Sequence, residues 1–121
     1  MLVLDTSAMI EVVKDSERGR KITEFVGELP TATTPFCVYE SLYPEKGTEK
    51  IKEMIGKMKM LDYDKESAHI TIEIEKELWR TGKMINLVDI FIAAICVRHG
   101  HEIVTCDEDF RKISKLKSRV F

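Results

Sequence analysis

Two short apolar runs that each lead to an aspartate constrain the fold of this chain more than any other feature of its sequence. "LVLD" ends at Asp5 near the amino terminus, and "IVTCD" ends at Asp107 near the carboxyl terminus. Runs this short and this rich in branched residues suit buried strands of a parallel sheet. Helical patterns lie between the predicted strands, and this alternation predicts an α/β fold. Both aspartates then fall at the carboxyl edge of the sheet, where sites form in such folds.

The remaining pattern predicts a single domain in which strands and helices alternate. Apolar residues at three- and four-residue steps predict two amphipathic helices, and a third helix that is apolar nearly all round. These helices are expected at residues 51–58, 64–81 and 87–99. The apolar face of the second helix should contain Ile70, Ile74, Leu78 and Trp79. Strands are expected at residues 2–4, 31–34, 60–61, 102–105 and, as an edge strand, 118–121. The single domain should extend over residues 1–121.

Composition and charge indicate an ordinary globular protein. Hydrophobic residues make up 44% of the chain and charged residues 33%, as in typical soluble domains. The formal net charge is −2, so no overall positive field attracts nucleic acid. A nucleic-acid ligand would therefore need a local basic patch or bound cations.

The cysteines and the apolar runs favour a cytoplasmic protein without a membrane segment. Cys37, Cys96 and Cys106 are odd in number and lack C-x-x-C spacing, so we expect reduced thiols that pack as small core residues. The amino terminus has no basic region of the kind found in signal peptides. The longest apolar run, residues 87–97, contains Asp89 and is too short to span a bilayer.

Asp5 and Glu40 each have an ordinary structural interpretation beside a functional one. Asp5 can cap the helix that follows it, because aspartate is a favoured N-cap residue. Glu40 lies in the second turn of a helix that starts after Thr34, and its neighbours are mostly apolar. An amphipathic helix could still turn Glu40 toward water. From these stretches alone, both interpretations of each residue stay open.

The same holds for Asp89 and Asp107. Asp89 lies three residues after Asn86, a spacing that resembles a capping box. Its helix is the most apolar of the chain, however, which favours a buried acid at the helix start. Asp107 follows an apolar strand and could cap a short helix that begins at Glu108.

Taken together, the four acids are hard to explain as isolated caps. Three of them follow, or lie just beyond, the ends of elements that reach the same sheet edge. Carboxylates gathered in a partly buried cleft repel one another and raise each other's pKa. A hard divalent cation such as Mg²⁺ or Mn²⁺ removes this penalty, and oxygen ligands suit both ions. We therefore predict that Asp5 is a metal ligand and that the ion activates water and stabilises charge on a phosphate.

In their order and approximate spacing, these motifs resemble a PIN domain, and more closely a small VapC-like toxin ribonuclease. The resemblance covers essentially the whole chain. It rests on "LVLDTSAMIE", on Glu40 in the helix after the second strand, on "LVDIFIAAI" and on "IVTCDEDF". It implies a three-layer α/β/α sandwich with a parallel sheet of about five strands, and hydrolysis of RNA phosphodiesters that depends on Mg²⁺ or Mn²⁺.

The resemblance also implies roles for individual residues. Asp5, Glu40 and Asp89 match the metal ligands of the family, and Asp107 matches its fourth, more variable acidic position. These four acids would form the catalytic metal site. Hydroxyl groups and one further acid would support them by orienting ligands or water: Thr6, Ser7, Thr105 and Asp109.

The partners that the resemblance implies are an RNA substrate, a second copy in a homodimer, and an antitoxin whose tail crosses the active site. A methionine-bearing helix at residues 51–58 could contact either protein partner, because methionine packs adaptably, or could belong to the core. Basic residues are not concentrated near the motifs. Four of them are candidate RNA contacts, although surface lysines are usually only solvated: Lys14, Arg18, Arg80 and Lys83.

The function that we predict is a metal-dependent endoribonuclease that acts as the toxin of a toxin–antitoxin pair. One alternative is a housekeeping PIN nuclease in RNA processing or decay, and another is a non-catalytic PIN-like scaffold. Small size without added domains favours the toxin, and acids at all four positions disfavour the scaffold. The three histidines lie outside the acidic motifs, so we expect no histidine general base.

Overall fold

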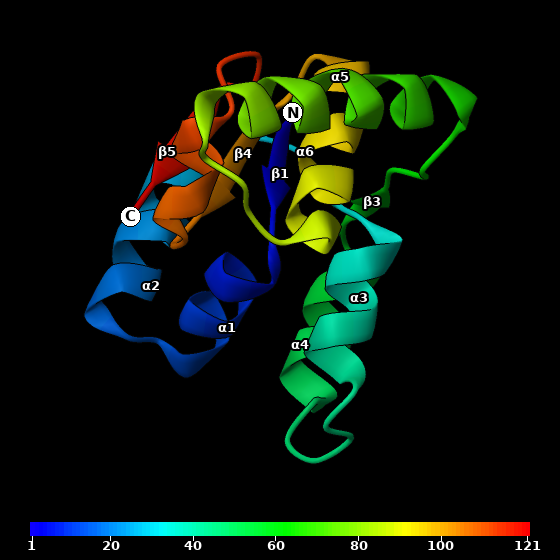
Figure 1. The fold of residues 1–121 in the computed structure, drawn as a ribbon. Helices are drawn as coiled ribbons and strands as arrows, with labels where there is room; N and C mark the ends of the chain where they lie inside the picture. Colours follow the sequence, from blue (N-terminus) through cyan, green and yellow to red (C-terminus); the bar gives the residue numbers. More distant parts are fainter.

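A parallel sheet of five strands forms the centre of the computed structural model, which describes all residues, 1–121 (Figure 1). The strand order is β3-β2-β1-β4-β5, and every neighbouring pair is parallel. The prediction of about five parallel strands is confirmed. The strands are β1 (Leu2–Leu4), β2 (Thr31–Thr33), β3 (Lys59–Met60), β4 (Glu102–Thr105) and β5 (Ser118–Val120).

Six α-helices and one 3₁₀ helix connect the strands and flank the sheet (Figure 1). Helix α6 contacts α5 and β4, α1 contacts α2, α4, β1 and β4, and α3 contacts both α1 and α6. This arrangement confirms the predicted α/β/α sandwich. No helix is both long enough and apolar enough to cross a bilayer. The helices are α1 (Thr6–Lys14), α2 (Glu17–Val26), α3 (Pro35–Leu42), α4 (Glu49–Gly56), α5 (Lys65–Thr81), α6 (Leu87–His99) and the 3₁₀ helix η1 (Glu108–Lys112).

Capping groups explain why several helices begin and end where the sequence suggests. The Thr34 side chain accepts a hydrogen bond from the Cys37 amide and caps α3. Asp64 caps α5 in the same way by accepting from the Ser67 amide. Gly82 ends α5 at a φ of +69°, a conformation that favours glycine. The helix predicted over 64–81 is therefore confirmed, although its "ITIEIE" segment alternates like a strand.

The predicted apolar face of α5 is wrong at one position. The Trp79 side chain is 77% exposed, whereas Ile74 and Leu78 are each only 1% exposed. The buried stripe of α5 also contains Ser67 and Thr71. Successive residues of this stripe are three or four positions apart, so they lie on one face of the helix. Because consecutive helical residues point about 100° apart, Trp79 falls outside this stripe.

Helix α2 was not predicted from the sequence. Its first half, "ERGRK", has no apolar side chain, and its apolar residues Ile22, Phe25 and Val26 come only in the second half. Ser16 nevertheless provides a cap signal, because its side chain accepts from the Gly19 amide at 2.9 Å. A Cβ atom on Gly19 would lie 2.0 Å from the Glu11 carbonyl oxygen. The start of α2 therefore packs closely against α1, and only glycine fits at this contact.

The three cysteines are unpaired, as predicted from their number and spacing. Cys37 and Cys96 are buried in the core, whereas Cys106 is partly exposed. The interpretation as small core residues therefore fits the first two thiols. Cys106 instead lies directly after β4, at the carboxyl edge of the sheet.

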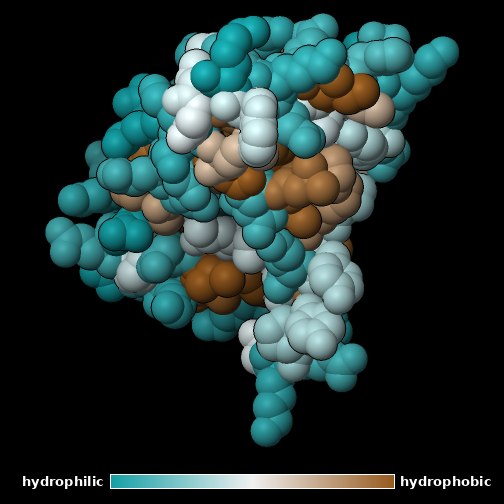
Figure 2. Space-filling model, viewed as in Figure 1, coloured by the Kyte–Doolittle hydropathy of each residue, from teal (hydrophilic) through white to brown (hydrophobic).

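The strand order creates a switch point in the middle of the sheet. From β1 the chain adds β2 and β3 on one side, and then β4 and β5 on the other side. Ligands in open parallel sheets bind outside the carboxyl ends of the strands at such a point. On the face of the molecule that is seen in Figure 1, separate apolar patches have hydrophilic side chains between them (Figure 2). A site is therefore expected between the ends of β1 and β4.

Candidate active site

Five acidic side chains gather at the carboxyl edge between β1 and β4. Asp5 follows β1 and Asp107 lies two residues beyond β4, while Glu40 lies on α3 and Asp89 on α6. Burial, together with the charges of these three acids and of Asp109, raises the pKa of the Asp89 carboxyl to about 6. The acids are therefore close enough to repel one another, as the sequence predicted.

Asp5 is the buried member of the cluster, with only 5% of its surface exposed. Its Oδ1 accepts hydrogen bonds from the Ser7 hydroxyl at 2.7 Å and the Ala8 amide at 3.0 Å. Its Oδ2 accepts from the Thr105 hydroxyl at 2.6 Å. Burial raises the pKa of Asp5, and these hydrogen bonds offset only part of that rise. The helix-cap interpretation is thus confirmed, yet Oδ2 retains a lone pair for a further ligand.

Two hydroxyl groups hold the ends of β1 and β4 together. Besides donating to Asp5, the Ser7 hydroxyl accepts a hydrogen bond from the Cys106 amide at 2.9 Å. The Thr105 hydroxyl likewise accepts from the Asp107 amide at 3.0 Å. Both residues therefore fix the orientation of the Asp5 carboxylate by linking it to the backbone of the neighbouring strand.

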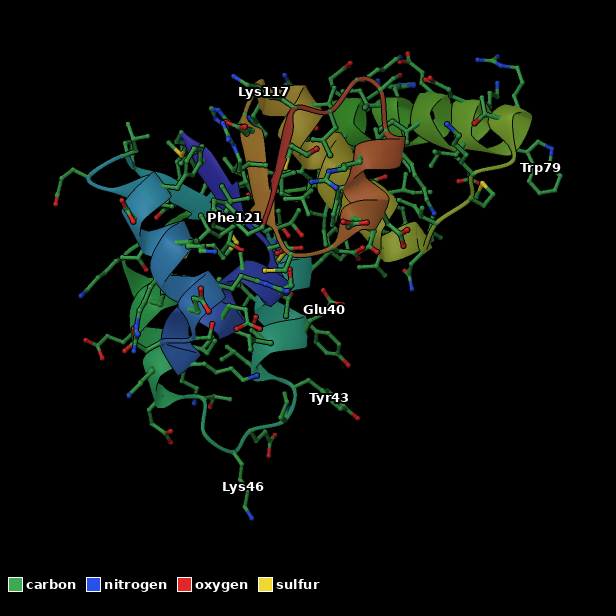
Figure 3. All side chains as sticks on the ribbon, turned by 90° about the vertical axis from the view of Figure 1, so that its left-hand side faces the viewer. Glu40, Tyr43, Lys46, Trp79, Lys117 and Phe121 are labelled. Atoms are coloured by element: carbon green, nitrogen blue, oxygen red, sulfur yellow. The ribbon has the colours of Figure 1, made fainter.

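The Glu40 side chain is exposed to water, so of the two alternatives, burial among apolar neighbours and exposure on an amphipathic helix, the second is correct. The Thr6 hydroxyl donates to Glu40 Oε1 at 3.1 Å and so connects the start of α1 with α3. The rings of Phe36 on α3 and Phe91 on α6 stack with their centroids 5.3 Å apart. Helix α3 is thereby held against α6, and Glu40 projects from its outer side (Figure 3).

Asp89 does not take part in a capping box, so that interpretation is wrong. The Asn86 side chain caps α6 by accepting from the Val88 amide at 2.8 Å. The Asp89 carboxylate is half-buried and receives no hydrogen bond from any protein group. A half-buried carboxylate without a donor is costly, and a bound cation would remove that cost.

Asp107 and Asp109 differ in what neutralises them. Asp107 accepts a hydrogen bond from the Asp109 amide at 2.9 Å and caps η1. This confirms the interpretation of Asp107 as the cap of a short helix. Asp109 instead forms an ion pair of 2.9 Å with Lys112. Lys112 was not predicted as part of the site, although its spacing of three residues from Asp109 on a short helix was a usable signal.

The structure brings only one of the four candidate RNA-binding residues to the site. Arg18 lies beside the Cys106 thiol. Burial raises the pKa of this thiol, and Arg18 offsets part of that rise. Lys14, Arg80 and Lys83 are exposed and form no ion pair or hydrogen bond with the acids. A role for these four residues in RNA binding stays a prediction.

The donor set fits a hard divalent cation held by few protein ligands. No three acidic, histidine or cysteine side chains converge closely enough to coordinate one ion by themselves. Mg²⁺ usually keeps several waters and takes one or two carboxylates from the protein. The lone pair on Asp5 and the unpaired Asp89 carboxylate meet that requirement. The assignment of all four acids as ligands stays a prediction.

Comparison with known proteins now identifies the family. The sequence model of the PIN domain family matches residues 2–116, so the chain belongs to this family. Among curated proteins, Ribonuclease VapC2 of Haemophilus influenzae is 28% identical over 127 residues, which cover 96% of this chain and 94% of the relative. The resemblance to VapC-like ribonucleases that the motifs indicated is confirmed.

Solved structures of the same kind share the fold. VapBC2 from Rickettsia felis, bound to a DNA fragment from its promoter, contains a chain with a TM-score of 0.86 and 18% identity. The match covers 99% of this chain and 98% of that chain. VapBC-1 from nontypeable Haemophilus influenzae gives a TM-score of 0.84 at 18% identity, with 98% of this chain and 96% of that chain covered.

Proposed function

We propose that the protein is a metal-dependent endoribonuclease and the toxin of a VapBC-type toxin–antitoxin pair. The observation that carries this proposal is the cluster of acids around Asp89, whose half-buried carboxylate has no donor within the protein. The PIN domain fold and the curated relatives named ribonuclease VapC support it. An uncompensated acidic cluster at the sheet edge suits a site that holds a cation and a phosphate rather than a purely structural element.

The chain's own residues would hold the ion and position it. Asp5 and Asp89 would bind Mg²⁺ or Mn²⁺, with Glu40 and Asp107 as further ligands directly or through water. When bound, the ion would neutralise phosphate charge and supply an activated water for hydrolysis. The Ser7 and Thr105 hydroxyls would keep the Asp5 carboxylate in one orientation. Because the pKa of Asp89 is about 6, its carboxyl is mostly ionised at neutral pH and able to bind a cation.

An apolar groove on the other side of α1 fits an antitoxin segment. The groove has a volume of about 480 Å³ and lies between α1, α2 and α4. Met54 and Met58 of the predicted methionine-bearing segment line it together with Val12 and Ile22. Adaptable methionines and a charged rim suit the apolar face of an amphipathic helix. The groove would thus give the proposed antitoxin a docking surface on the side of α1 that carries α2 and α4.

A self-complementary strip on α5 supports the proposed homodimer. Ile72 and Trp79 are 52% and 77% exposed and line a shallow hollow with Glu75 and Lys76. In an antiparallel pair of α5 helices, Ile72 would face Trp79 of the partner subunit, and Glu75 would face Lys76 of the partner subunit. Apolar and opposite-charge contacts would then form twice about one two-fold axis. Trp79→Ser should convert the dimer to a monomer in light-scattering measurements, and an unchanged mass would contradict this contact.

The free thiols support a cytoplasmic location as part of the same proposal. All three cysteines are unpaired, and two are buried where disulfide exchange cannot reach them. Reduced thiols persist in the cytosol, where glutathione and thioredoxin systems operate.

The experiment that tests the proposed activity is RNA cleavage by matched proteins. Wild type and Asp5→Asn would be incubated with structured and single-stranded RNAs in Mg²⁺, Mn²⁺ or EDTA. The substitution keeps the size and much of the capping ability while removing the charge that the ion needs. We expect cleavage by wild type alone, and none in EDTA.

Two results would contradict the proposal. Equal cleavage by both proteins would indicate a contaminant. No cleavage by wild type, together with no rise in its melting temperature in Mn²⁺, would indicate a PIN-like scaffold, because an ion that binds the folded state must stabilise it.

A further inference from the structure

Two exposed tyrosines lie near Glu40 along the chain, one on helix α3 and one at its C-terminal end. The Tyr39 and Tyr43 side chains are 65% and 69% exposed, and their ring centroids lie 5.5 Å apart at an interplanar angle of 46°. The third tyrosine, Tyr63, behaves differently: it is half-buried, and its hydroxyl shares a hydrogen bond with Thr71 at 2.9 Å. Solvent-exposed rings are thus confined, among the tyrosines, to the turn that carries Glu40.

The tyrosine pair extends outward from the acids along α3. Figure 3 shows Glu40 and Tyr43 on the same side of this helix, with Lys46 at the loop beyond it. A helical rise of about 1.5 Å per residue places Tyr43 about 4.5 Å farther along the helix axis than Glu40. Tyr39 precedes Glu40 directly and is in ring contact with Tyr43. The two rings therefore lie close along the chain to Glu40, one of the acids proposed to hold the ion.

We infer that Tyr39 and Tyr43 form a stacking platform for the bases of single-stranded RNA next to the scissile phosphate. This inference rests on the proposed function. Aromatic side chains bind unpaired bases through their π faces, and such stacking tolerates any base sequence. A base that inserts between two rings needs them about 7 Å apart, twice a contact distance of about 3.5 Å. At 5.5 Å the pair has no such gap, so bases stack on its outer faces.

The charges of this region favour stacking over phosphate contacts. Helix α3 has the sequence "PFCVYESL" and contains no lysine or arginine. The neighbouring acids repel phosphates unless a cation is bound. Binding along α3 must therefore come from the bases, and this part of the affinity should depend little on salt concentration.

The test separates base stacking from every other contribution to RNA binding. Affinities of a fluorescent octanucleotide and of an abasic octanucleotide backbone would be measured by anisotropy in Ca²⁺, with gels showing that both stay intact. Wild type would be compared with Tyr39→Ala/Tyr43→Ala and with Tyr39→Phe/Tyr43→Phe, which retains both rings. Met60→Ala, on the edge strand β3, removes an exposed apolar side chain elsewhere and serves as the matched control.

We expect wild type to bind the octanucleotide at least about tenfold more tightly than the abasic backbone, since stacking of one base contributes about this much. The alanine pair should lose this preference, whereas the phenylalanine pair and Met60→Ala should keep it. A preference that survives in the alanine pair would overturn the inference. So would a change in oligomeric state with the preference intact, because a second copy would then cover the rings. If wild type neither binds nor cleaves any RNA, the proposed function itself fails.

Discussion

Two aspartates at the starts of adjacent helices show how differently one side chain can behave in this protein. Asp64 begins α5 and accepts hydrogen bonds from the Ser67 amide and hydroxyl, each at 2.8 Å, and from Arg98 at 3.2 Å. These contacts, with the Ser67 amide first, lower its pKa to about 2. Asp89 lies in the first turn of α6, receives no hydrogen bond, and has its pKa raised to about 6 by burial and by the other acids.

The difference between the two shows that partners, and not position on a helix, decide what an acid does. The N-terminal end of a helix favours negative charge at both positions. Asp64 adds satisfied hydrogen bonds to this effect and stabilises the fold. Asp89 faces four further acids instead, so its ionised form carries a cost that a bound cation would remove. Such an unfavourable local arrangement is expected at functional sites.

The largest effect that this comparison predicts is on cleavage. Asp89→Asn should lower RNA cleavage at least about 100-fold, because the variant lacks a charged ligand for the ion. It should also abolish the rise in melting temperature on addition of Mn²⁺. Asp64→Asn is the matched control, since it makes the same change on α5 and should leave cleavage unchanged. Equal losses in the two variants would show that Asp89 is no more functional than Asp64.

The next effect is on thermal stability. Asp64→Ala removes the cap of α5 and the partner of Arg98, and should lower the melting temperature by roughly 5 °C. Differential scanning calorimetry would measure the change. Asp62→Ala, two residues earlier and exposed, gives the control and should change little. If both substitutions lowered the melting temperature equally, the capping role of Asp64 would be wrong.

Asp89→Asn should have the opposite effect on stability in the absence of metal. In EDTA at pH 8 it should raise the free energy of unfolding by about 1 kcal/mol, a modest gain because solvent screens a half-buried charge. Because the pKa of Asp89 is raised, the stability that its protonated form contributes is fully present below about pH 4. This contribution is lost as the pH rises through about 6. Urea denaturation should therefore show the gain at pH 8 and none at pH 4. A loss of stability at pH 8 would contradict the repulsion.

The smallest predicted effect concerns the basic residues. Arg18→Ala should weaken RNA binding a few-fold, because Arg18 lies beside the site. The slope of the logarithm of the binding constant against the logarithm of the salt concentration should become shallower by about 0.7 per lost phosphate contact. Arg80→Ala, at the far end of α5, should leave both quantities unchanged. Binding titrations between 50 and 200 mM salt, a range of roughly fourfold in ionic strength, would decide. Matching changes in the two variants would mean that proximity to Cys106 is irrelevant.

Much of the fold could be predicted because its signals are local. Thr34 and Gly82 mark helix boundaries through the hydrogen bonds and backbone angles that each makes within a few residues. The errors have equally specific causes. Helix α2 begins with a run of polar residues and has few apolar ones, and Trp79 is apolar in type but lies off the buried face of α5.

For the site, the sequence showed which acids follow the strands but not how each is satisfied. The cap roles of Asp5 and Asp107 were predicted as alternatives, and both are confirmed. The capping box at Asp89 was equally reasonable and is wrong. Nothing in the local sequence shows that Asp89 would be left without a donor, since that depends on the distant elements that surround it.

By itself, the sequence determined the element types, the parallel sheet and the acids at its carboxyl edge, because caps and periodicity act over a few residues. Only the tertiary structure decided that β1 and β4 are neighbours, which lets Thr105 bind Asp5 across 100 positions of sequence. It likewise decided that Glu40 and the tyrosines beside it face water. These outcomes depend on how whole faces of the elements pack, a sum over many distant contacts that no short stretch of sequence contains.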